Sequence, residues 1–109
     1  MSDVQRFVTQ LASSVASEES GPFLFVLVGG TKISGKLIGR KGYIERMRAI
    51  AALVSESERA MFEAAFVQLE TAPDLLDTLY LDNASVNDHP FGAWCISISA
   101  VDAAAVLVG

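Results

Sequence analysis

Glycines, lysines and hydroxyl side chains gather in one short stretch of the sequence, where they could bind phosphate. Gly30, Gly35 and Lys36 follow an apolar run with the spacing of a phosphate-binding loop. In such a loop the backbone N–H groups surround the phosphates, and the lysine reaches the terminal ones. The position that should supply a hydroxyl for Mg²⁺ is Leu37, and the next residues include two more glycines instead of a clear helix start. The sequence therefore argues against a nucleotide-binding loop.

A second glycine pair, Gly39 and Gly42, encloses Arg40 and Lys41. It resembles the Gly-x-x-Gly loop with which KH domains clamp a nucleic-acid backbone between two helices. However, residues 32–37 alternate between polar and apolar like a strand, and no apolar helical face follows Gly42 at the expected spacing. The net charge of −5 also lacks the basic footprint of a general nucleic-acid binder. A KH domain is therefore the less favoured interpretation of this stretch.

Nucleophilic catalysis has one candidate pair, Cys95 and His89, the single cysteine and the single histidine of the chain. The two could approach only through a turn at residues 90–92, and no third member of a triad is apparent. Flanked by Trp94 and Ile96, Cys95 is more simply a small core hydrophobe. A lone cysteine also excludes an internal disulfide and a cysteine-rich zinc site. We therefore expect no catalytic residue, no metal, no cofactor and no enzymatic activity.

The elements that must position these residues follow from the periodicity of the sequence. Residues 3–16 carry apolar side chains at three- and four-residue spacing and predict an amphipathic helix, with a linker over 17–22. Residues 23–28 are continuously apolar and predict a fully buried strand. Alternation from Lys32 predicts a half-buried strand, in which Gly35 marks a bend or a close backbone approach. Residues 43–53 are expected to begin as a strand.

The second half of the chain predicts one more helix and three more strands. A capping box from Ser55 to Glu58 starts a helix that ends before Pro73. Alternating residues predict strands at 79–86 and 93–101 with a turn at 87–92. The short apolar tail over 103–108 predicts a last strand. Four apolar residues of the helix are expected to pack inward: Met61, Phe62, Phe66 and Leu69.

The apolar strand, the turn at Gly29-Gly30 and the pattern Ile33-x-Gly35-x-Leu37 together resemble the first motif of the Sm-like family, most closely its Hfq-like bacterial branch. Residues 98–101 resemble the family's closing segment. The resemblance implies a mainly β fold with helices, an SH3-type five-stranded small barrel with an N-terminal helix and one inserted helix. In it Gly30 forms a turn, and Gly35 lets the second strand bend so that the barrel closes. A single domain would then span 1–109, with the N-terminal helix at about 3–16, barrel strands at about 22–54 and 77–108, and the inserted helix at about 56–71.

Members of that family close rings by pairing the outermost strand of one subunit with that of the next, which removes exposed strand edges. The resemblance therefore implies a homo-oligomeric ring of five to seven subunits. A hydrophobic fraction of 51% in a chain of only 109 residues agrees with apolar surface buried between subunits. The chain begins without the features of a signal peptide and has no apolar run long enough to span a bilayer. We expect a cytoplasmic protein without membrane contact.

Two functions follow as alternatives. If Arg40, Lys41 and Tyr43 surround the pore of a ring, they would bind single-stranded RNA weakly and without sequence specificity, the cations on phosphates and the tyrosine on bases. However, Lys41 and Glu45 stand where family members carry base-reading residues around the aromatic, and 94–96 is apolar where the second motif is polar. The alternative is a non-enzymatic oligomeric scaffold with a protein partner at the inserted helix. Six of the eight basic residues form the strip that favours RNA: Lys32, Lys36, Arg40, Lys41, Arg46 and Arg48.

Overall fold

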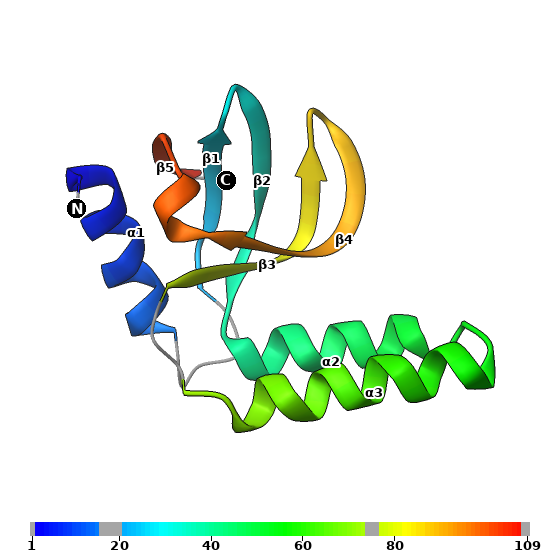
Figure 1. The fold of residues 1–109 in the computed structure, drawn as a ribbon. Helices are drawn as coiled ribbons and strands as arrows, with labels where there is room; N and C mark the ends of the chain where they lie inside the picture. The colour runs from blue at the N-terminus through cyan, green and yellow to red at the C-terminus, as the bar shows by residue number, and fades with distance from the viewer. Residues whose placement is uncertain (1, 16–20, 74–76, 108–109) are drawn as a thin grey trace.

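Five antiparallel strands form one open sheet, accompanied by three α-helices, in a computed structural model that describes residues 2–15, 21–73 and 77–107 (Figure 1). Most of the predicted linker over 17–22, and the last residues of the predicted first helix and last strand, lie outside the described residues. Within them the predicted α and β content is confirmed in outline. The elements are α1 (Asp3–Ser14), β1 (Phe23–Val28), β2 (Thr31–Ile38), α2 (Arg40–Ala51), α3 (Glu56–Thr71), β3 (Thr78–Val86), β4 (His89–Ser97), the 3₁₀ helix η1 (Ile98–Ala100) and β5 (Ala103–Leu107).

The strand order in the sheet is β4-β3-β2-β1-β5, so β4 and β5 are its two edges. β1 and β2 form a hairpin whose two turn residues, Gly29 and Gly30, have φ angles of 56° and 84°. A two-residue hairpin turn of this kind needs positive φ at both positions, which glycine adopts without strain. The predicted turn at Gly30 is therefore confirmed.

Gly35 lies where the backbone of β3 comes close to β2. The register of the two strands shifts next to Gly35, opposite Asn83, whose φ of 50° marks an irregular residue in β3. A Cβ atom on Gly35 would lie 3.0 Å from the carbonyl oxygen of Asp82 and from Leu81 Cβ, and 3.1 Å from Ala84 Cα. A side chain at this position would require the neighbouring strand to shift by a few tenths of an ångström. The predicted close approach at Gly35 is confirmed, and such bulges sharpen the bend of a strand.

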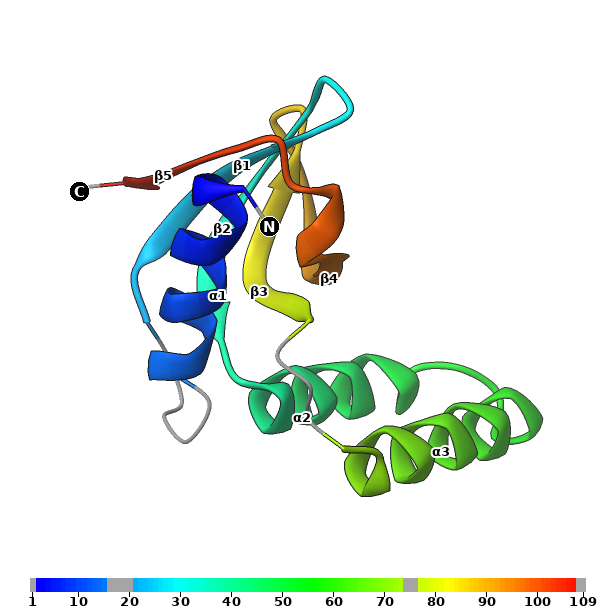
Figure 2. The same ribbon diagram turned by 60° about the vertical axis from the view of Figure 1, so that its left-hand side comes forward.

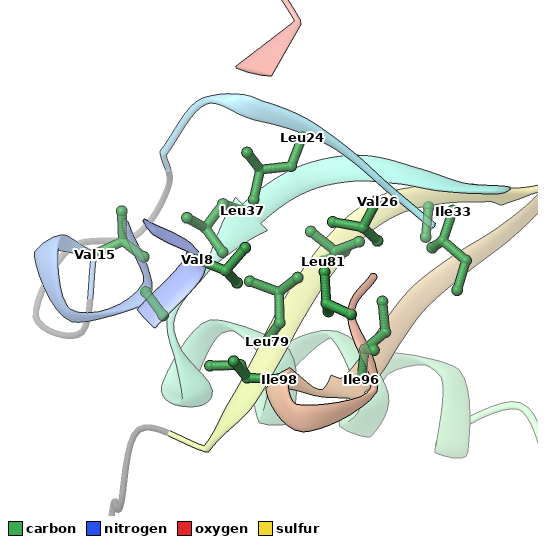
Figure 3. Close-up of a cluster of buried hydrophobic side chains, with 13 residues drawn as sticks. Val8, Val15, Leu24, Val26, Ile33, Leu37, Leu79, Leu81, Ile96 and Ile98 are labelled. Carbon is green, nitrogen blue, oxygen red and sulfur yellow. The ribbon is translucent and has the colours of Figure 1, made fainter. Parts of the chain in front are cut away.

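The main hydrophobic core lies between α1 and the inner face of the bent sheet (Figure 3). α1 begins at a capping box made by Ser2 and Gln5, and it buries Val8 and Ala12 on the stripe that faces the strands. In β1 only Leu24 and Val26 are fully enclosed. The prediction of a fully buried β1 is wrong, because this core lies on one face of the strand and alternate residues point away from it. The largest side chains fully enclosed in the core are Leu24, Leu37, Leu79, Leu81, Val8 and Val26.

The predicted strand over 43–53 is wrong, because most of this segment forms the helix α2. Gly39 is the N-cap, and Gly42 falls inside the first turn. These two glycines indicated a loop, although the segment is rich in the helix-forming residues Arg, Glu, Met and Ala. Ile44 and Ala51 are seven residues apart and form its buried side. A strand, not a helix, precedes Gly39, which is also unlike the KH arrangement.

The two views show α1 beside the sheet and the pair α2–α3 below it, with α2 nearer to the strands than α3 (Figures 1 and 2). The predicted turn over 87–92 is shorter than expected, since only Asn87 and Asp88 turn, with φ of 50° and 70°, and His89 already belongs to β4. The strand predicted over 93–101 ends at Ser97, where η1 begins. The helix predicted over 56–71 and the last strand are confirmed within the described residues.

Candidate functional site

Helices α2 and α3 form an antiparallel hairpin inserted between β2 and β3, with a small hydrophobic core of its own. Ile44 and Ala51 of α2 and Phe66 of α3 are its buried members. Phe66 stays only 7% exposed, whereas most of α3 is open to solvent. The hairpin is therefore a projecting unit held by a few contacts, and we refer to residues 40–71 as the helical hairpin.

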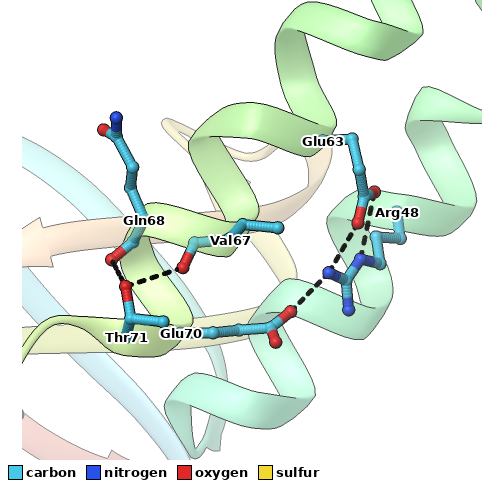
Figure 4. Close-up of polar contacts among 6 residues, drawn as sticks. All are labelled: Arg48, Glu63, Val67, Gln68, Glu70 and Thr71. Atoms are coloured by element: carbon cyan, nitrogen blue, oxygen red, sulfur yellow. Dashed lines mark hydrogen bonds and ion pairs between the residues drawn. The ribbon is translucent and has the colours of Figure 1, made fainter.

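Arg48 ties the two helices together (Figure 4). Its guanidinium donates to both carboxylate oxygens of Glu63, at 3.2 Å from Nε and 2.7 Å from Nη2, and also pairs with Glu70. The same group lies over the ring of Phe66, 5.7 Å from its centroid. Hydrogen bonding to Glu63 raises the pKa of Arg48 above its ordinary value. Arg48 is thus a structural clamp, and its two-carboxylate geometry is typical of arginine.

Arg40 joins the beginning of α2 to the end of α3. Its guanidinium donates to the carbonyl oxygens of Ala72 at 2.9 Å and Pro73 at 3.5 Å. The last turn of α3 has no basic residue of its own, so Arg40 supplies the positive charge that favours the C-terminal end of a helix. One of the three residues predicted to bind RNA is therefore already engaged within the chain.

Tyr43 attaches α2 to the outer face of the sheet. Its ring lies 5.0 Å from that of Tyr80 on β3, and its hydroxyl donates to Cys95 Sγ on β4 at 3.5 Å. Burial, with a further contribution from Cys95, raises the pKa of Tyr43 well above its ordinary value. Arg46 strengthens the same attachment through an ion pair of 3.1 Å with Asp82.

The three predicted RNA-binding residues lie in or near the first turn of a helix, not in a loop, and they do not share one surface. Arg40 and Lys41 line a hollow of about 330 Å³ that also includes Arg48, Glu45 and Glu70, among other residues. Tyr43 does not line this hollow and packs on the sheet. Lys41 is exposed. The hollow mixes both charges, so it is not a uniformly basic phosphate site.

Cys95 and His89 are at opposite ends of β4, where Cys95 pairs with Tyr80 and His89 pairs with Val86. Cys95 is exposed, so its prediction as a core residue is wrong. Alternation along the strand explains this, since the neighbouring Ile96 points into the core. Within residues 2–15, 21–73 and 77–107, no group of three or more His, Cys, Asp or Glu side chains is placed to hold a metal ion.

Exposed apolar side chains lie at both sheet edges and on the helical hairpin. Phe91 on β4 is 55% exposed, and Val106 and Leu107 on β5 are also open. On α3, Met61 and Phe62 are exposed although they were predicted to pack inward. The prediction is right for Phe66 and Leu69 and wrong for these two, because α3 packs on the narrow helix α2 and not on the broad face of the sheet.

Comparison of the chain with protein-family models, with curated proteins and with solved structures finds no match. No helix in the described residues has both the length and the apolar character needed to cross a membrane. The function must therefore be argued from the two sheet edges and the helical hairpin. Of these, sequence reasoning missed α2, whose signal was the spacing of Ile44, Met47 and Ala51.

Proposed function

We propose that this protein is the subunit of a homo-oligomeric, Sm-like assembly that acts as a non-enzymatic interaction scaffold. The observation that carries the proposal is the pair of open sheet edges, β4 and β5, neither of which has a second neighbouring strand within the described residues. Each edge presents a row of backbone N–H and C=O groups that favours pairing with another chain. Pairing β4 of one subunit with β5 of the next would satisfy both rows at once.

Three further features support a closed assembly over an open filament. The bulge at Gly35 bends the sheet, as the Sm-like resemblance implies. An N-terminal helix precedes five antiparallel strands, with the helical hairpin inserted between β2 and β3, as in the implied barrel with an inserted helix. Phe91 and Val106 place exposed apolar side chains on opposite edges, where a neighbour would bury them. A head-to-tail contact of this kind gives a ring when its rotation closes.

Lysine substitution on an edge strand tests this proposal, because lysine is a residue with which natural sheets discourage edge pairing. The Val106→Lys variant should lower the native mass measured by sedimentation, since it places a charge within the β5 edge. The matched control is Val67→Lys on α3, at a valine of similar exposure, 49% against 40%. A Val106→Lys variant that keeps the mass of the wild type would show that the β5 edge is not an assembly surface.

RNA binding at the pore is the second candidate, and one observation favours it. The first turn of α2 carries Arg40 and Lys41 and no acidic residue, so its charges and its helix dipole are both positive. Titration with oligo-U and oligo-A at two salt concentrations would then show affinity falling with a slope of about −0.7 per phosphate contact. Lys41→Ala should flatten this slope, because it removes one phosphate contact. Absence of binding at low salt would remove this candidate and leave the scaffold.

A further inference from the structure

The sheet completes its strand pairing without the helical hairpin. The ladder between β2 and β3 runs up to the base of the hairpin, where Ile38 pairs with Tyr80 and Leu37 pairs with Leu81. Leu37 and Leu81 are fully enclosed in the main core. Among the residues that the structure describes, this core and the small core of the helical hairpin have no member in common. Each unit therefore buries its own apolar side chains, as separately opening units of one domain do.

Polar contacts join the two helices of the helical hairpin to each other. Arg48 of α2 pairs with Glu63 and Glu70 of α3. Arg40, at the start of α2, donates to the two carbonyl oxygens that follow α3. The helices are thus connected near both ends of α2, and Phe66 is buried between them. We expect them to move together.

The helical hairpin is fastened to the sheet chiefly by one side of α2. Tyr43 and Arg46 are three residues apart, so they lie on the same side of the helix. Tyr43 packs on Tyr80 with its ring 5.0 Å away and donates to Cys95 Sγ at 3.5 Å. Arg46 pairs with Asp82 at 3.1 Å. No hydrogen bond between backbone groups of the described residues joins the helical hairpin to a strand. We call Tyr43 and Arg46 the latch.

We infer that the helical hairpin is a hinged arm, which opens from the sheet as one unit while the sheet stays folded. Its hinge is Gly39 between β2 and α2, a residue with wide backbone freedom and no side-chain cap. Helices of 12 and 16 residues with three buried side chains between them are marginal without a sheet to pack on, so opening also loosens the helices.

Opening of the arm changes which surface of the sheet is accessible. The closed arm lies against the outer face of β3 and β4, where the latch contacts Tyr80, Asp82 and Cys95. The open arm releases this face, which includes the edge strand β4. The latch lies within one chain, so the inference does not rest on the proposed assembly. It adds to the fold a conformational switch between two arrangements of the same sequence.

Hydrogen exchange of the full chain at neutral pH, followed by mass spectrometry of its peptides, tests the inference. Peptides from α2 and α3 should exchange at one common rate, faster than peptides from β1 and β2. Tyr43→Ala should accelerate exchange in both helices by about tenfold or more, because the ring contact and the hydroxyl hydrogen bond are lost together. It should leave β1 and β2 unchanged, because the main core does not include Tyr43.

Arg46→Ala should act in the same direction as Tyr43→Ala and more weakly. The expected acceleration is about 1.5- to 5-fold, since an exposed ion pair contributes little. The matched control is Arg6→Ala on α1, which also removes an ion pair from an arginine of similar exposure, 69% against 64% for Arg46. This control should leave exchange in the helical hairpin unchanged.

Exchange of both helices at the rate of β1 and β2 would overturn the inference, because the hairpin and the sheet would then open together. An acceleration confined to α2 in Tyr43→Ala would also overturn it, because the two helices would not form one unit. Tyr43→Phe keeps the ring and removes only the hydroxyl, so it replaces Tyr43→Ala if that variant does not fold. It should accelerate exchange in both helices by about twofold or more, and the same two results would overturn the inference.

Discussion

Gly35 is the residue on which the curvature of the sheet depends most directly. Gly35→Ala should destabilise the protein by about 1–3 kcal/mol, because the added Cβ would crowd β3 and force its backbone to shift. Urea unfolding at fixed protein concentration measures this cost. Gly29→Asn is the control, since nothing lies within 4 Å of that position and asparagine tolerates its positive φ. An equal loss of unfolding free energy in the two variants would mean that the crowding at Gly35 does not cause the destabilisation.

Tyr43 makes the free energy of unfolding fall as the pH rises above 10. Its pKa in the folded protein is raised above the ordinary value of 10.0, first by burial. As the pH rises above 10 the unfolded chain releases this proton while the folded protein still holds it, so stability falls there and is unaffected below. Tyr43→Phe should remove the part of this loss of stability that is due to Tyr43, as measured by urea unfolding at several pH values above and below 10. Identical pH profiles for the variant and the wild type would contradict the burial of this hydroxyl.

At the residue scale, glycine positions were predictable from the sequence and side-chain partners were not. Gly30 and Gly35 stand in a hairpin pattern that demands a turn and a bend, which local backbone chemistry explains. The contact of Tyr43 with Cys95 joins residues from two distant elements. It depends on α2 being a helix that lies across the sheet, which no local pattern around either residue specifies.

Phe66 is the anchor of the helical hairpin at the scale of elements. Phe66→Ala should cost about 3–5 kcal/mol, because its ring is buried between the two helices. Phe62→Ala is the control on the same helix, and its ring, which is 40% exposed against 7% for Phe66, should cost only about 1 kcal/mol. Urea unfolding followed by circular dichroism measures both. A similar cost for both variants would mean that the two rings are equally enclosed, contrary to the observed packing.

Element prediction succeeded where one periodicity dominated and failed where two signals conflicted. α1 and α3 begin at capping residues and carry helical spacing, and β1 and β2 are set by their hairpin. α2 was missed because Gly39 and Gly42 suggested a loop, whereas one caps the helix and the other is tolerated in its first turn. Met61 and Phe62 were assigned to the core because residue spacing shows which side of a helix is apolar. Spacing does not show how much of that side the neighbouring element covers.

At the scale of the whole molecule, the family resemblance implied a closed five-stranded barrel with one helix before it and one inserted within it. The sheet is open and not closed on itself within the described residues, so both edges remain for a neighbour. The apolar excess of the composition indicated exposed apolar surface but could not place it on β4, β5 and α3. Placement depends on strand order, which is a long-range property of the fold.

The native mass of the wild-type protein, measured by sedimentation at micromolar concentration, tests the central claim most directly. A chain of 11.6 kDa that pairs β4 with β5 of its neighbour should sediment as one discrete species of five to seven subunits. The mass should be stable on dilution, because ring closure leaves no free edge. A species with the mass of one chain would contradict the assembly.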